Sequence, residues 1–218
     1  MGSIDDLAHL VRPASGEPEG ALVLLHGRGT SEHDLAPLLD ELDPDRRLVG
    51  ITPRGPLTLP PGGAHWYVVQ RVGFPDPDTF FLSLARLAVF LGGIPDAFEV
   101  PLERTVIGGF SQGAVMSHAL SFAAGRPRPA ATIGLSGFIP SVDGFELDLD
   151  DLRGYPVALG HGTYDPVIDV SFGRTARDTL AEAGAAVTWH ESPMAHSVDP
   201  AYLAELADWL ERVLPPAP

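Results

Sequence analysis

The sequence predicts an α/β protein built on a mostly parallel, doubly wound sheet. Short apolar runs alternate along the chain with longer segments whose apolar residues recur at helical spacing. Several of the short runs are apolar at almost every position, which is typical of strands buried on both faces. Strands separated by helices imply right-handed crossovers, and these produce a parallel sheet with helices on both faces.

The first part of the chain contains two expected strands and one expected helix. Residues 21–25 (Ala-Leu-Val-Leu-Leu) form a continuous apolar run that stops at the turn signal of residues 26–29 (His-Gly-Arg-Gly). In residues 31–42, leucines recur at helical spacing behind a serine that is suited to cap a helix. A second strand is expected over residues 47–52, and Pro53 ends it.

A long irregular stretch follows over residues 53–77. It is rich in Pro and Gly, and a loop of this length inside a compact domain is usually functional or mobile. Trp66 and Tyr67 lie within it, so we expect part of the stretch to fold back onto the body of the protein. Residues 78–91 then form an expected, strongly apolar helix.

The rest of the chain continues the alternation of strands and helices. The expected strands cover residues 104–110, 130–135, 156–160 and 186–190, and the expected helices cover residues 112–124, 170–183 and 200–214. An acidic loop is expected over residues 138–154. We therefore expect a single domain over residues 1–214, and a disordered tail at residues 215–218 (Pro-Pro-Ala-Pro).

Composition and charge exclude several classes of protein. The chain has 218 residues, with 14 basic and 29 acidic side chains, and its net charge of −15 opposes binding to nucleic acid or to anionic membrane. The absence of Cys excludes disulfides, thiolate metal sites and a cysteine nucleophile. No run of about 18 apolar residues and no secretion signal occur, so we expect no membrane span and a cytoplasmic location.

The chain also contains no Lys and no Asn. Both residues have AT-rich codons, so a GC-rich genome is one explanation. Adaptation to salt or to heat is the alternative, because acidic surfaces occur in halophiles and loss of Asn, Gln and Cys accompanies heat adaptation.

The strongest chemical signal is Gly109-Phe110-Ser111-Gln112-Gly113, which follows an expected strand and opens an expected helix. In this context the motif G-x-S-x-G forms a sharp turn that exposes the serine hydroxyl above the sheet, beside a helix N-terminus. We therefore predict Ser111 as a nucleophile. The alternative is a tight turn that needs glycines and a serine cap.

A serine nucleophile needs a base and an acid, which should follow it in the chain. Of the eight histidines, His196 has the expected place, on a loop after the last strand and before the final helix. Asp165 directly follows the strand of residues 156–160, so it is the predicted acid. The competing carboxylates lie in the acidic loop or at the start of a helix: Asp143, Asp148, Asp150, Asp151 and Asp169.

Serine hydrolysis also needs N–H donors for the oxyanion. One donor should be the backbone of Gln112, and the other should come from the turn of residues 26–29. Both donate through the backbone, which leaves the side chains of Arg28 and Gln112 for other contacts. The Arg28 side chain is expected either to attract an anionic leaving group or acyl tail, or to pair with a nearby carboxylate.

Taken together, these pieces resemble the phospholipase/carboxylesterase branch of the α/β-hydrolases. The resemblance covers about residues 20–212 and keeps the order of the motifs. It rests on Leu25-His26-Gly27-Arg28-Gly29, Gly109-Phe110-Ser111-Gln112-Gly113-Ala114, Leu135-Ser136-Gly137, His161-Gly162-Thr163-Tyr164-Asp165-Pro166-Val167 and Ala195-His196.

The resemblance implies an α/β-hydrolase fold without a large cap domain, and a site with assigned roles. It implies Ser111 as nucleophile, Asp165 as acid and His196 as base, with the backbone N–H groups of Arg28 and Gln112 as the oxyanion hole. Trp66 and Phe138 are similar in placement to residues that line the acyl pocket. No cofactor or metal is implied.

Two positions depart from the family pattern. The family usually has Gly before the catalytic histidine, where this chain has Ala195, and this predicts a slightly different loop. It often has an apolar residue where Arg28 stands, which predicts a substrate-binding mouth that is not purely apolar.

We therefore predict a hydrolase that cleaves small carboxylic esters of short to medium acyl length through an acyl-enzyme. Acyl thioesterase or lysophospholipase activity on longer chains is the alternative, and peptide or lactone cleavage is a third serine-hydrolase reaction. The alternative hypothesis from another functional class is a binding or scaffold protein that keeps the fold without catalysis. We predict no particular oligomeric state, and a homodimer is one option.

Overall fold

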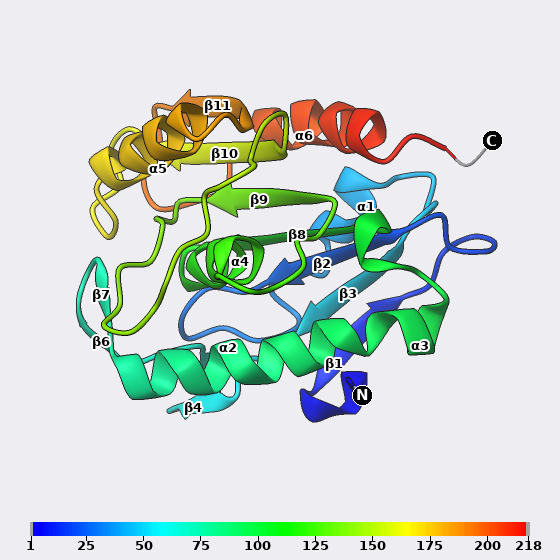
Figure 1. Ribbon diagram of the computed structural model, residues 1–218, viewed down its shortest axis with the longest axis horizontal. Helices are drawn as coiled ribbons and strands as arrows, with labels where there is room; N and C mark the ends of the chain where they lie inside the picture. Colours follow the sequence, from blue (N-terminus) through cyan, green and yellow to red (C-terminus); the bar gives the residue numbers. More distant parts are fainter. Residues whose placement is uncertain (1, 217–218) are drawn as a thin grey trace.

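The computed structural model describes residues 2–216 and has a central sheet of seven strands in the order β1-β3-β2-β8-β9-β10-β11 (Figure 1). The strand β1 pairs antiparallel with β3, and every other pair in this sheet is parallel. The strands are β1 (His9–Arg12), β2 (Ala21–Leu25), β3 (Val49–Pro53), β8 (Thr105–Phe110), β9 (Ala131–Leu135), β10 (Pro156–Gly162) and β11 (Ala186–Ser192). The predicted α/β class with a mostly parallel sheet is confirmed.

Helices cover both faces of the sheet because the central strands are apolar on both sides. Along β2, Val23 packs in one core cluster with residues of α2 and α4, while Leu22 and Leu24 pack in another with residues of α1 and α6. The helix α5 packs with β10 in a third cluster. The helices are α1 (Leu38–Leu42), α2 (Pro77–Gly92), α3 (Ile94–Phe98), α4 (Gln112–Phe122), α5 (Val170–Glu182) and α6 (Pro200–Val213), with 3-10 turns at Ile4–Asp6 and Leu102–Arg104.

The helix expected over residues 31–42 is much shorter than predicted. Only Leu38–Leu42 is helical, and the Ser31 hydroxyl accepts a hydrogen bond from the backbone of His33 within a turn. The side chain of Leu35 is buried all the same. Pro37 is the reason, because a proline disfavours the helical conformation of the residue before it and stands here at the helix start.

The edge strand β1 was not among the expected strands. None of its residues is fully buried, because it pairs only with β3 at the margin of the sheet. It therefore lacks the continuous apolar run by which the inner strands are recognised.

The irregular stretch of residues 53–77 folds into two small hairpins. One pairs β4 (Leu57–Leu59) with β5 (Gly63–His65), and the other pairs β6 (Val69–Arg71) with β7 (Phe74–Pro75). Between them the chain returns to the core, where 0% of the Trp66 surface and 2% of the Tyr67 surface are exposed. The hairpin of β6 and β7 projects at the left of Figure 1, beyond the ends of the central strands.

Within residues 2–216, one helical stretch, Pro77–Phe98, is long and apolar enough to cross a bilayer by length and composition alone. No such stretch was expected from the sequence. Its inner face packs on the sheet, where Phe80, Leu87 and Phe90 are fully buried. Core helices of globular proteins pass the same test, so the stretch is weak evidence for a membrane span.

The C-terminal end of the chain packs against the residues that lead into β3 and β8. Arg104 donates a hydrogen bond to the Pro215 carbonyl at 3.1 Å, and Arg47 donates to the Leu214 carbonyl. Residues 217–218 lie outside the described residues, so the disorder expected for residues 215–218 stays a prediction.

Candidate active site

Ser111 lies on a sharp turn between β8 and α4. Its backbone has φ 56° and ψ −119°, a conformation that a residue with a side chain rarely adopts. The flanking glycines make the turn possible, since a Cβ on Gly113 would lie 1.9 Å from the Leu25 carbonyl oxygen and one on Gly109 would lie 2.4 Å from Gly113. The turn brings the Ser111 hydroxyl to the carboxyl end of the sheet.

Three predicted site residues meet there in a chain of hydrogen bonds. The Ser111 Oγ lies 2.9 Å from Nε2 of His196, and Nδ1 of His196 lies 2.6 Å from Oδ2 of Asp165. Because a carboxylate only accepts, Nδ1 carries the hydrogen and the neutral ring accepts the serine proton at Nε2. The three residues follow β8, β11 and β10, whose carboxyl ends share one edge of the sheet.

The carboxylate of Asp165 is fixed on its other side by the backbone. Its Oδ1 accepts hydrogen bonds from the N–H groups of Val167 and Ile168 at 2.8 and 2.9 Å, and the side chain is fully buried. His161 lies 3.5 Å from Oδ2 and bonds to the Ile168 carbonyl. These contacts hold the carboxylate in one orientation, which in turn fixes the imidazole of His196.

The loop that carries His196 passes close to β10. A Cβ on Gly162 would lie 2.3 Å from the Ala195 carbonyl oxygen, so a glycine is needed there. Ala195 itself is exposed and does not have a positive φ, so its methyl group fits where the family usually has Gly. The ring of Phe110 packs against the imidazole of His196 with centroids 4.7 Å apart.

The turn after β2 is held by His26 rather than by its glycines alone. The His26 Nδ1 donates to the Gly27 carbonyl at 2.7 Å, and Nε2 accepts from the Gly55 N–H at 2.9 Å. Burial lowers the pKa of His26 and keeps the ring neutral, as acceptance at Nε2 requires. In the described part of the chain, the backbone N–H of Arg28 has no partner. The N–H of Gln112, at the first position of α4, has none within the helix, so both can donate to an oxyanion.

The Gln112 side chain has a role that sequence analysis missed. Its Oε1 accepts from the Trp66 N–H at 3.0 Å, and its Nε2 donates to the Tyr67 carbonyl at 2.9 Å. The side chain is therefore not free, but holds the long loop against the turn of Ser111. The signal in the sequence was the glutamine directly after Ser111. Its partners lie more than forty residues earlier in the chain.

A cavity of about 300 Å³ opens over Ser111. Arg28 and Phe138 line it, as predicted, whereas Trp66 does not. The Trp66 indole is fully buried and donates to the His26 carbonyl at 2.8 Å, which places it beneath the turn instead of in the cavity. The full lining comprises Arg28, Tyr67, Val69, Arg71, Val72, Gly73, Phe74, Pro75, Ser111, Gln112, Phe138, Val167 and Ile168.

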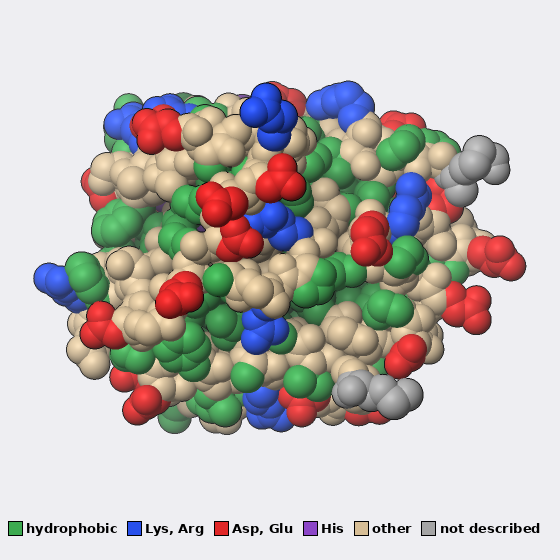
Figure 2. Space-filling model, viewed as in Figure 1, with side chains coloured by type: hydrophobic (Ala, Val, Ile, Leu, Met, Phe, Trp, Pro, Cys, Tyr) green, Lys and Arg blue, Asp and Glu red, His purple; other side chains and the backbone are tan. Residues whose placement is uncertain are grey.

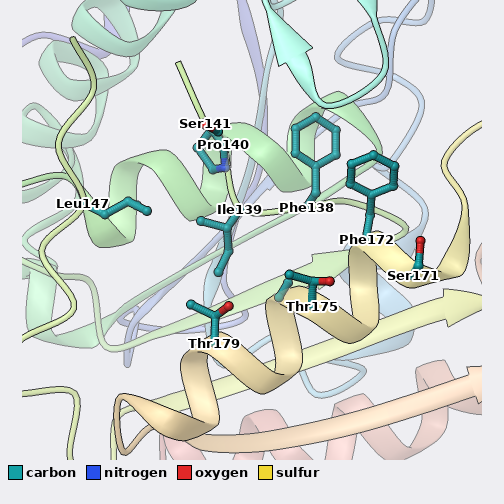
Figure 3. Close-up of a pocket in the computed structure, with 10 residues that line it drawn as sticks. Phe138, Ile139, Pro140, Ser141, Leu147, Ser171, Phe172, Thr175 and Thr179 are labelled. Carbon is teal, nitrogen blue, oxygen red and sulfur yellow. The ribbon is translucent and has the colours of Figure 1, made fainter. Parts of the chain in front are cut away.

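A second hollow of about 390 Å³ lies on the other side of Phe138 (Figure 3). Figure 3 shows Phe172, Thr175 and Thr179 of α5 along one wall, with Ile139 facing them. The rings of Phe138 and Phe172 lie side by side, with centroids 5.5 Å apart. Phe138 lines both spaces and divides them.

Within residues 2–216, no group of three or more His, Cys, Asp or Glu side chains is arranged to hold a metal ion.

Comparison with known proteins assigns the chain to a family. Residues 8–214 match the model of the family described as Phospholipase/Carboxylesterase. The chain belongs to this family. Since its members are esterases and thioesterases, this member is a hydrolase acting on an ester or thioester bond.

Relatives and solved structures of the Phospholipase/Carboxylesterase family resemble this member over nearly its whole length. The acyl-protein thioesterase 1 of Candida albicans is 29% identical over 223 residues, which cover 93% of this chain and 96% of that protein. The acyl-protein thioesterase 1 of Yarrowia lipolytica is 29% identical over 217 residues, covering 92% and 94%.

The Bacillus cereus carboxylesterase has a TM-score of 0.83 at 23% identity, covering 95% of this chain and 94% of that one. At this identity the likeness shows the fold alone.

Proposed function

We propose that this hydrolase is a carboxylesterase that cleaves esters of short to medium acyl length. The observation that carries the proposal is the unbroken hydrogen-bond chain from Asp165 through His196 to Ser111, whose hydroxyl faces the cavity. A serine hydroxyl bonded to an imidazole that a carboxylate orients is the arrangement used for acyl transfer.

The reaction follows from these contacts. The Ser111 Oγ attacks the ester carbonyl carbon as its proton passes to His196 Nε2, and the oxyanion accepts hydrogen bonds from the N–H groups of Arg28 and Gln112. His196 then gives the proton to the leaving alcohol, and an acyl-enzyme remains. Water repeats the sequence, releases the carboxylic acid and returns the proton to Ser111. Asp165 stays ionised and stabilises the imidazolium in both halves.

The size and lining of the cavity support small substrates. A volume of about 300 Å³ is at the lower end of the range for small-molecule sites. Val69, Val72 and Val167 supply an apolar wall that suits a short acyl chain, and Phe138 limits its length.

Hydrolysis of 4-nitrophenyl butyrate by the purified protein tests the proposal. The wild-type protein should turn the ester over, and Ser111→Ala should lower kcat by about 10⁴-fold or more while the fold is retained. Equal turnover by the two proteins would overturn the role of Ser111.

A second candidate is an acyl thioesterase or lysophospholipase that acts on longer chains. The acyl-protein thioesterases among the relatives favour it, and so does the hollow behind Phe138, which would accept a longer chain if the ring moved. A series of 4-nitrophenyl esters from two to sixteen carbons, with one palmitoyl thioester and one lysophospholipid, separates the candidates. We expect kcat/KM to differ about tenfold between preferred and disfavoured acyl lengths. A maximum at long chains would favour the second.

A further inference from the structure

Two arginines line the mouth of the catalytic cavity. Arg28 follows the turn after β2, and Arg71 ends β6 on the projecting hairpin. The lining contains no Asp and no Glu. Among the described residues neither guanidinium forms an ion pair or donates a hydrogen bond. Arg28 therefore does not pair with a nearby carboxylate, which was the alternative expected from the sequence.

This lack of ion pairs contrasts with two other arginines of a protein that has 29 acidic and 14 basic side chains. Arg54 pairs with Glu32 at 2.9 Å, and Arg174 pairs with Glu191 at 2.6 Å. Acidic side chains are also scattered over the face of the molecule in Figure 2. The summed field of the protein repels an anion, so two unneutralised guanidinium groups at one mouth create a local exception.

Both arginines line the cavity that opens over Ser111. The Arg71 guanidinium stacks over the ring of Phe74 at 3.5 Å, which holds its plane and leaves the N–H groups on its edge available. Arg28 is attached to the backbone N–H that faces the oxyanion, so its side chain begins beside the reacting carbonyl.

We propose that the preferred substrates are small esters that also carry a free carboxylate, which Arg28 and Arg71 bind. The inference rests on the proposed esterase function and adds the class of substrate to it. A guanidinium matches a carboxylate with two parallel N–H donors, and such charge-assisted bonds exceed neutral ones in strength. The carboxylate stands either on the acyl side or on the alcohol side of the ester, and the two arms of the experiment separate these sources.

The experiment compares esters matched in shape but not in charge. For the acyl side, ethyl hydrogen glutarate is compared with ethyl glutaramate, in which an amide replaces the carboxylate. For the alcohol side, 4-acetoxybenzoate is compared with 4-acetoxybenzamide. The readout is the ratio of kcat/KM for the charged ester to that for its neutral partner, because the chemistry shared by the two esters cancels in this ratio.

We expect Arg28→Gln and Arg71→Gln each to lower this ratio about tenfold in at least one arm, as loss of a charged hydrogen bond predicts. The wild-type ratio should also fall as salt rises from 10 mM to 500 mM, since salt screens an exposed charge pair. Arg126→Gln is the matched control, because Arg126 is also without an ion pair but lines a separate hollow beside α2. Its ratio should equal that of the wild type.

The inference would be overturned if Arg28→Gln and Arg71→Gln both left the ratio unchanged in both arms. So would an equal fall in Arg126→Gln, since that would indicate only the overall charge. Failure of the esterase proposal looks different, because then the neutral esters are not cleaved and Ser111 does not react with a fluorophosphonate. Cleavage of neutral esters with unchanged ratios removes only the carboxylate preference.

Discussion

Two clusters of Ser, His and Asp in the described part of the chain differ in the order of their hydrogen bonds. In the first, the imidazole of His196 stands between the Ser111 hydroxyl and the Asp165 carboxylate. In the second, at the end of β11, the carboxylate of Asp199 stands in the middle. Its Oδ2 accepts from the Ser192 hydroxyl and lies 3.2 Å from Nε2 of His190.

The difference lies in the order of the hydrogen bonds. The second serine donates to a carboxylate, so no imidazole can take its proton during attack. Asp199 also caps α6, since its Oδ1 accepts from the Ala201 N–H at 2.9 Å. The His190 ring stacks on Tyr202 with centroids 4.3 Å apart. This cluster ties β11 to the final helix, whereas the Ser111 cluster has the arrangement that we propose for catalysis.

The largest expected effect separates the two carboxylates. Asp165→Asn should lower kcat for 4-nitrophenyl butyrate by about 10⁴-fold, because an amide favours the wrong tautomer of His196. Asp199→Asn should keep kcat within about threefold and cost about 1 kcal/mol of unfolding free energy at most, since Asn also caps helices. Steady-state kinetics and urea unfolding measure both. Similar losses of kcat in the two variants would contradict the distinction.

A large effect on stability is expected at the residue that holds the catalytic turn to the long loop. Gln112→Ala leaves the Trp66 N–H and the Tyr67 carbonyl buried without partners, at a cost of about 1–3 kcal/mol for each group. The melting temperature should fall by roughly 5–15 °C and kcat/KM should fall with it. The second cluster has no such link to the loop, so Ser192→Ala serves as the control. A melting temperature of Gln112→Ala equal to that of the wild type would show that Gln112 does not hold the loop in place.

A histidine outside both clusters predicts a pH effect of intermediate size. His118 is fully buried on α4, its Nδ1 donates to the Phe138 carbonyl at 2.9 Å, and burial lowers its pKa to about 4. The unfolded chain binds a proton near pH 6.5, whereas the folded protein does not until about pH 4. Stability should therefore fall as the pH drops through this window.

His118→Gln removes the titration and keeps a donor for the Phe138 carbonyl. Between pH 7.5 and pH 5 the wild-type protein should lose about 2 kcal/mol more unfolding free energy than the variant, at about 1.4 kcal/mol per pH unit below 6.5. Urea unfolding at both pH values gives the comparison. Parallel pH dependence in the two proteins would show that His118 is not held neutral.

The smallest expected effect lies within the second cluster. The Ser192 hydroxyl, the Ala201 N–H and His190 lower the pKa of Asp199, with Ser192 the largest cause. Ser192→Ala should raise the pKa of Asp199 toward its usual value and leave kcat within about twofold, since Ser192 has no part in proton transfer. A carboxyl titration by NMR measures the shift, and an unchanged pKa would contradict the central place of Asp199.

Much of this molecule could be predicted from local pattern. The inner strands β2, β8 and β9 are apolar at nearly every position because both of their faces are buried. The motif around Ser111 and the strand ends then predict which side chains meet, since parallel strands end at one edge.

The remainder depends on contacts that no local pattern carries. The edge strand β1 is half exposed, and Pro37 interrupts an otherwise helical spacing. The contacts of Gln112 with the loop and the burial of Trp66 arise because the loop returns to residues that lie forty or more positions away in the sequence. The second cluster shows the same limit, because the order of its hydrogen bonds exists only in three dimensions.

The most direct test of the central claim is covalent labelling by a fluorophosphonate, with the labelled peptide located by mass spectrometry. An activated serine attacks the phosphorus and displaces fluoride, whereas an ordinary serine does not. We predict one label per chain on Ser111, none on Ser192, and loss of labelling in His196→Ala but not in His190→Ala. Labelling of Ser192, or labelling of Ser111 that persists without His196, would contradict the account.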